Sequence, residues 1–161
     1  MLSLSQKRLA TMVAVAVCLL GLGVWGLDLQ ARQTRDVTRK LDLEDIETSL
    51  RRSLVISGTL PPEDTPTWCG VLGLPAHQAI RDAVNHALRQ TEKYRNPAKP
   101  FPTDLRFHGT DRDYVYHKTS PVSFELLAEL EADQTNARVL ADCGTGNAFD
   151  YAIVSPVRFS L

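Results

Sequence analysis

Apolar and polar positions divide this chain into an uncharged N-terminal stretch and a mixed remainder. Positions 9–27 carry no charged side chain, and Lys7 and Arg8 directly precede them. A helix that crosses a bilayer needs about 20 apolar residues, and Trp25 lies near the far end, where an interfacial aromatic is common. The pattern predicts a short tail over 1–8 and a transmembrane helix over 9–27, with the lipid bilayer as a partner.

A cleaved signal peptide and a lipoprotein signal share parts of this pattern. The apolar core of a signal peptide is about 7–15 residues long and ends at a small-residue site, whereas this run is longer and ends at Gly23-Val24-Trp25-Gly26-Leu27. Cys18 would be the lipidated residue of a lipoprotein, but Val17 precedes it where such signals have a small side chain. We therefore expect a retained anchor, with Cys18 as an apolar side chain inside it.

The anchor is expected to continue directly into a second helical segment. Residues 29–57 contain neither Gly nor Pro, and Gly58 follows them, with Pro61 and Pro62 behind it. This is the usual order of a glycine stop and a later proline. Apolar side chains recur at three- and four-residue steps and form one helix face: Leu43, Ile46, Leu50 and Leu54. We predict a stalk and domain helix over 28–57.

Only the second half of that helix is expected to be embedded in the domain. The apolar stripe strengthens after Leu41, so the part before it should be an exposed stalk. A flexible joint is expected where glycines cluster, at Gly21, Gly23 and Gly26. The basic residues beyond the anchor are interpreted as a solvated helix face: Arg32, Arg35, Arg39 and Lys40.

The remainder, residues 58–161, is long enough for a single small globular domain. A second helix is predicted over 75–92, with a buried side made by Ile80, Ala83, Val84, Ala87 and Leu88. Alternation predicts an antiparallel hairpin and one later strand: 113–117 and 124–131 with a turn at 118–121, then 150–154. A long helix packed on a small antiparallel sheet is an α+β fold.

Charge and cysteine content bear on location and partners. With 18 basic and 19 acidic residues the net charge is −1, so nucleic acid is not an expected partner. Cys69 and Cys143 are the two cysteines outside the anchor, and such a pair in an exported domain indicates a disulfide. Counting Lys and Arg beside the anchor gives the opposite orientation by the positive-inside rule. We favour a domain outside the cytoplasm because of the cysteine pair.

Three acidic residues around Gly109 could gather oxygen ligands for Ca²⁺: Asp104, Asp111 and Asp113. Arg106 and Arg112 are interleaved with them, and the spacing is not that of an EF-hand loop, so a turn with a solvated charge cluster is the preferred interpretation. The four histidines do not share a metal-ligand spacing: His77, His86, His108 and His117. We therefore predict no metal site and no cofactor.

A row of glutamates in the second predicted strand offers the other candidate chemistry. Glu125, Glu129 and Glu131 would point to one side, and paired carboxylates can act in acid–base catalysis. No nucleophile or base partner lies near them in sequence, and a polar face of an exposed sheet explains the row. Gly144-Thr145-Gly146 lacks the surroundings of a phosphate loop. We expect neither an enzyme nor a small-molecule substrate.

Several segments occur here in an order that is typical of one protein family. An apolar helix continues through Asp42-Leu43-Glu44-Asp45-Ile46-Glu47 to Gly58-Thr59-Leu60-Pro61, and strands follow at Tyr114-Val115-Tyr116 and Phe124-Glu125-Leu126. Over most of its length the chain thereby resembles type IV pilins and pseudopilins, which implies a pilin-like domain. Pilin precursors carry a Gly-Phe-Thr-x-x-Glu processing site, whereas this chain has Ser5-Gln6-Lys7-Arg8-Leu9-Ala10-Thr11, so an uncleaved anchor is expected.

The resemblance implies a structural or assembly role in a filament or envelope complex, through self-association or binding to other membrane subunits. The alternative is an accessory or docking subunit of a larger membrane protein complex. Small residues in the anchor would allow close helix contacts in lipid, and Gly21 and Gly23 are the predicted packing positions.

Overall fold

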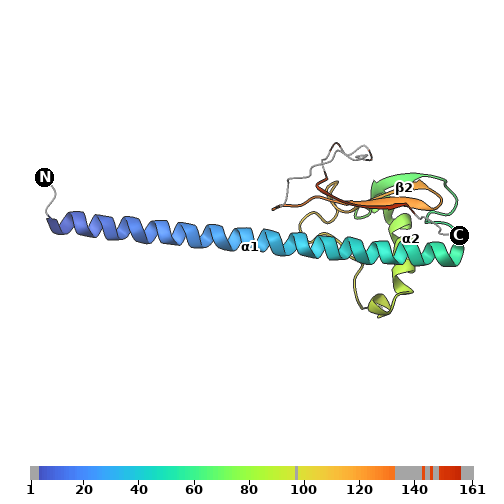
Figure 1. Cartoon of the computed structure of the whole chain (residues 1–161), viewed down its shortest axis with the longest axis horizontal. Coiled ribbons are helices and arrows are strands. Elements are labelled where there is room, and N and C mark those ends of the chain that lie inside the picture. Colours follow the sequence, from blue (N-terminus) through green and yellow to red (C-terminus); the bar gives the residue numbers. More distant parts are fainter. Residues whose placement is uncertain (1–3, 97, 133–142, 144–145, 147–148, 157–161) are drawn as a thin grey trace.

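The computed structural model describes residues 4–96, 98–132, 143, 146 and 149–156, and this part has the predicted α+β fold. Figure 1 shows one long helix, with the compact part of the molecule lying along its C-terminal half. The elements in chain order are α1 (Leu4–Ser57), β1 (Trp68–Val71), η1 (Pro75–His77), α2 (Gln78–Arg89), η2 (Glu92–Tyr94), β2 (Val115–Ser120), β3 (Ser123–Ala128) and β4 (Tyr151–Pro156).

Helix α1 runs without a break through Gly21, Gly23 and Gly26, where the flexible joint was predicted. Each glycine costs a helix about 1 kcal/mol relative to alanine, but the surrounding leucines, valines and alanines keep the segment helical. The predicted stop is confirmed: Gly58 has a φ of +77°, and its N–H donates to the Leu54 carbonyl at 2.9 Å. A left-handed residue at this position suits glycine because it lacks a Cβ.

The N-terminal half of α1 is uncovered by the rest of the chain. All side chains from 11 to 34 are exposed, including large apolar ones such as Leu20 at 71% and Leu22 at 64%. Within the part of the chain that the structure describes, α1 is the one helix long and apolar enough to cross a bilayer. A continuous apolar surface of this size indicates contact with lipid or with another protein.

The C-terminal half of α1 packs on one face of the sheet, beside α2. The predicted stripe is confirmed, since Leu43, Ile46 and Leu50 are fully buried. They share one core with residues of α2 and the strands: Val84, Leu88, Tyr114, Tyr116, Phe124 and Leu126. Burial begins earlier than predicted, however, because Asp36 and Arg39 are also enclosed.

The sheet is antiparallel throughout, in the order β1-β2-β3-β4. The predicted hairpin is present, but β2 extends through Lys118 to Ser120, so the turn falls at Pro121-Val122 instead of 118–121. The reason is Lys118, which is fully buried and donates from Nζ to three backbone carbonyls: those of Leu60, Pro62 and Thr65, at 2.6–2.8 Å. A lysine read from sequence as a turn residue is thus a strand residue that holds the segment after α1.

The second predicted helix is shorter than expected at both ends. It is split into the 3-10 turn η1 and the α-helix α2, which ends at Arg89, while η2 follows separately. The predicted buried side holds for Val84, Ala87 and Leu88, whereas Ile80 and Ala83 are half-buried. The buried side of α2 packs against α1, and its opposite side faces solvent.

A second, smaller cluster covers the other face of the sheet. It contains Val71, Val115, Leu127 and Phe149, with Cys143 packed beside them. The disulfide between Cys69 and Cys143 is present, with their Cα atoms 5.3 Å apart. This bond joins the edge strand β1 to the segment that follows β3, across 74 positions of sequence.

Candidate functional site

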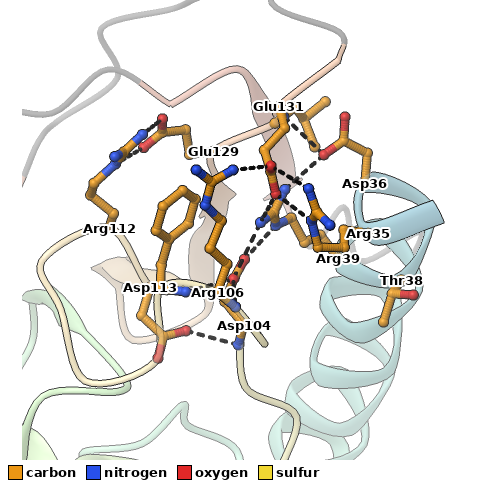
Figure 2. Close-up of polar contacts among 12 residues, drawn as sticks. Arg35, Asp36, Thr38, Arg39, Asp104, Arg106, Arg112, Asp113, Glu129 and Glu131 are labelled. Atoms are coloured by element: carbon orange, nitrogen blue, oxygen red, sulfur yellow. Dashed lines mark hydrogen bonds and ion pairs between the residues drawn. The ribbon is translucent and has the colours of Figure 1, made fainter. Parts of the chain in front are cut away.

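The most distinctive site in the described part is a buried group of charges where α1 meets the domain. Arg39 lies on the same helix face as Leu43, four residues before it, and this position turns its guanidinium into the domain. Three carboxylates surround it (Figure 2): Asp36 at 2.7 Å from Nη1, Glu131 at 2.7 Å from Nη2, and Asp104, which accepts from Nε. Together with Arg35 and Arg106, which also bind Glu131, these residues form what we term the Arg39 network.

Asp36 and Glu131 connect α1 to the chain just beyond β3. Glu131 accepts hydrogen bonds from Nε and Nη2 of Arg35 at 2.8 and 2.7 Å, in a bidentate pair. Asp36 on α1 in turn accepts hydrogen bonds from the backbone N–H groups of Glu131 and Ala132, at 2.9 and 2.8 Å. Charge-assisted bonds of this type are stronger than neutral ones, so helix and strand end are held at a fixed mutual position.

Asp104 and Asp113 organise the loop on the opposite side of Arg39. Asp104 accepts hydrogen bonds from the backbone N–H groups of Arg106 and Phe107, at 2.8 and 2.9 Å. Asp113 accepts hydrogen bonds from the backbone N–H groups of Asp104 and Tyr114, at 3.2 and 2.7 Å. Both aspartates are buried, at 2% and 1% exposed, whereas Asp111 is exposed. The interpretation as a solvated charge cluster is therefore wrong for Asp104 and Asp113 and holds for Asp111.

The Arg39 network contains as many acidic as basic side chains: Asp36, Asp104 and Glu131 against Arg35, Arg39 and Arg106. A divalent cation would need carboxylates that are free to bind it, and here arginines occupy them. Within the described residues, no group of three or more His, Cys, Asp or Glu side chains is placed to hold a metal ion. The arrangement joins two structural elements.

The row of glutamates on one strand face is a wrong prediction. Strand β3 ends at Ala128, so Glu129 and Glu131 lie beyond it and each takes an arginine partner. Glu129 pairs with Arg112, while Glu125 lies 3.0 Å from Nδ1 of His117 on the neighbouring strand. The three carboxylates therefore bind separate partners and do not contact one another as an acid–base pair.

The remaining candidates are placed apart from one another. His77 Nδ1 lies 2.9 Å from the Val71 carbonyl, and His108 Nδ1 lies 3.2 Å from Asp113. Gly21 and Gly23 lie in the exposed half of α1, where a Cβ added at either would meet no other atom within 4 Å. The glycine-rich Gly144-Thr145-Gly146 segment lies mostly outside the described residues.

Ionisation within the Arg39 network follows from these contacts. The bidentate bond from Arg35 is the main reason that the pKa of Glu131 falls to about 2, and Arg39 and Arg106 lower it further against the opposing effect of burial. Burial alone would lower the pKa of Arg39, but its bonds to Asp104 and Glu131 outweigh that effect and raise it. Arg35, Arg39 and Glu131 are thus charged near neutral pH.

The lowered pKa of Glu131 predicts a specific loss of stability in acid. Because its ordinary pKa is 4.5 and its folded pKa is about 2, its contribution is fully present above pH 4.5 and is lost as the pH falls through about 2. Comparing the full chain with Glu131→Gln by urea unfolding isolates this contribution. We expect the wild type to be more stable at pH 7 and the difference to shrink between pH 4.5 and 2. A difference that stays constant over that range would contradict the assignment.

Comparison with known proteins yields no relative: no family model, curated protein or solved structure matches this chain.

Proposed function

We propose that this chain is a single-pass membrane protein with a structural role, whose pilin-like domain lies outside the cytoplasm and whose helix assembles with copies of itself or with other membrane subunits. The observation that carries the proposal is the division of α1, whose first half is apolar and uncovered while its second half is built into the domain. One continuous helix thereby links the lipid-exposed part to the folded part.

The stalk supports association beyond the anchor as well. Val37 and Leu41 are 57% and 52% exposed, and they lie four residues apart on one helix face. Between this pair and the anchor, the same face carries the exposed but uncharged side chains of Gln30, Gln33 and Thr34. A neighbouring helix could therefore contact α1 along a length greater than the membrane thickness.

Location outside the cytoplasm is supported by the disulfide. Cytosolic thiols are kept reduced, whereas disulfides persist in exported proteins. The bond between Cys69 and Cys143 ties β1 to the chain after β3, and this placement favours export of the domain over the orientation given by the positive-inside count.

A second function, that of an accessory docking subunit, is favoured by the end of the molecule farthest from the anchor. There, Val55 and Ile56 are 82% and 69% exposed on the last turn of α1. Ile56 also borders a distal groove of about 310 Å³, lined by Ser53, Ile56, Ser57, Glu63, His86, Ala87 and Gln90. Co-purification with an unrelated membrane complex in fixed proportion would favour this function, and a ladder of self-crosslinks would favour the first.

The assembly proposal predicts that Gly21→Leu and Gly23→Leu weaken helix association. Glycine lets helix backbones approach closely in lipid, and leucine would hold them apart. The two positions are about 200° apart around the helix, so each single variant reports on a different face. Crosslinking in native membranes should show fewer oligomers in the double variant, with Val24→Leu as the control. Unchanged oligomers in the double variant would count against assembly through this helix.

A further inference from the structure

A groove lies between α1 and the loop after Asp104, on the side of the domain that faces the anchor. Its lining residues define the juxtamembrane groove: Asp28, Arg32, Arg35, Leu105 and Arg106. The hollow measures about 430 Å³. Three of its five residues are arginines and one is acidic.

Position along α1 brings the edge of this groove nearest the anchor, at Asp28 and Arg32, to the level of lipid headgroups. Arg32 and Arg35 lie five and eight residues beyond Leu27, which is about 7 and 12 Å at the helical rise. The headgroup layer on each side of a bilayer is about 5–7 Å thick. Helical side chains lean toward the N-terminus, so these arginines extend back toward the membrane.

The arginines in the groove carry more N–H donors than their ion pairs use. Arg32 and Arg106 are about half exposed, at 45% and 55%. Among the described residues, Arg32 pairs with Asp28 alone, one turn away, in an exposed ion pair of the kind that contributes little. Arg35 and Arg106 share the single carboxylate of Glu131, and each guanidinium carries five N–H donors.

An apolar side chain lies beside these donors. Leu105 is 82% exposed, and its neighbours in sequence are the buried Asp104 and the half-exposed Arg106. An exposed leucine next to an arginine matches the chemistry of a membrane interface, where the apolar side chain enters the acyl boundary and the cation meets phosphate.

We propose that the juxtamembrane groove binds the phosphate of an anionic phospholipid headgroup in the leaflet that the domain faces. Arg32 and Arg106 donate to the phosphate oxygens, since guanidinium geometry suits bidentate phosphate recognition, and Leu105 lies beside the bound headgroup on the side away from the anchor. The inference rests on the membrane anchoring proposed above. It adds a lipid-selective contact that fixes the domain against the bilayer.

The test uses the full chain in nanodiscs of mixed phosphatidylglycerol and phosphatidylcholine, with retained lipids identified by native mass spectrometry. Arg32→Gln with Arg106→Gln should reduce phosphatidylglycerol affinity by about 30-fold, at about 1 kcal/mol for each arginine. The matched control is Arg51→Gln with Arg52→Gln, because Arg51 is 46% exposed and pairs with Glu47 one turn away on the same helix. The control should retain wild-type selectivity for phosphatidylglycerol.

Equal retention of phosphatidylglycerol by the two double variants would overturn the inference. Displacement of the lipid by inorganic phosphate would also overturn it, because the groove would then be a site for free phosphate. If Arg106→Gln lowers the urea midpoint, Arg32→Gln with Leu105→Gln repeats the test on two exposed side chains. Failure of the wild type to insert into nanodiscs would refute the anchoring and this inference with it. Insertion without lipid selectivity would refute this inference alone.

Discussion

Replacing Arg39 by methionine is expected to lower the free energy of unfolding by about 3–5 kcal/mol, the range found when one partner of a buried ion pair is removed. Arg39 is 2% exposed and contacts three carboxylates. Methionine fills a similar space but donates no hydrogen bond, so the carboxylates would remain buried without their shared cation. Urea unfolding of the full chain in detergent micelles, followed by near-ultraviolet circular dichroism, measures the change.

Arg35→Met is the matched control for this prediction. Arg35 lies one turn earlier on α1, is 30% exposed and, within the described part of the chain, forms its ion pair with Glu131 alone, so the expected loss is about 1 kcal/mol or less. Adding Asp104→Asn to Arg39→Met should recover part of the stability, because it removes one of the charges left unpaired. Equal losses in Arg35→Met and Arg39→Met would contradict the central position of Arg39.

The same network fixes how the domain sits on its stalk. Arg39 joins residues 65 and 92 positions away in sequence, at the point where α1 enters the folded part. Because α1 is continuous through this point, movement of the anchor would be transmitted to the domain without an intervening hinge. A subunit that assembles through its helix needs such a connection if the domains are to be held in register.

Local patterns were sufficient to predict most of the elements. The stripe of Leu43, Ile46 and Leu50 and the stop at Gly58 depend on residues close together in sequence, and both are confirmed. The hairpin was also predicted, although its turn was misplaced because Lys118 was taken as a solvated turn residue. Its burial depends on carbonyls 53–58 positions away, which no local pattern contains.

The Arg39 network was missed for the same physical reason. A run of basic residues after an anchor is usually solvated, and nothing near Arg39 in sequence identifies Asp104 or Glu131 as its partners. One signal was present, however. Asp36 and Arg39 continue the buried stripe backwards from Leu43 at steps of three and four residues, so an opposite-charge pair on the buried face of a helix could have indicated a polar contact with the domain.

Loss of the disulfide should have an effect of similar size to loss of Arg39. Cross-linking Cys69 to Cys143 closes a loop across 74 positions, and the chain-entropy relation gives about 4 kcal/mol for a loop of this length. Replacing both cysteines by serine should therefore lower the free energy of unfolding of the full chain by about that amount. This is a large share of the 5–15 kcal/mol typical of a small domain.

The expected loss arises mainly in the unfolded state, because serine at both positions leaves the main core untouched. Leu43, Tyr116 and Phe124 belong to that core, whereas Cys143 packs on the smaller cluster across the sheet. Cys18→Ser is the control, since Cys18 is an exposed free cysteine of the anchor, and it should leave stability unchanged. Thiol alkylation in native membranes adds an independent readout: Cys69 and Cys143 should react only after reduction. Reaction without reductant would contradict both the bond and the placement of the domain outside the cytoplasm.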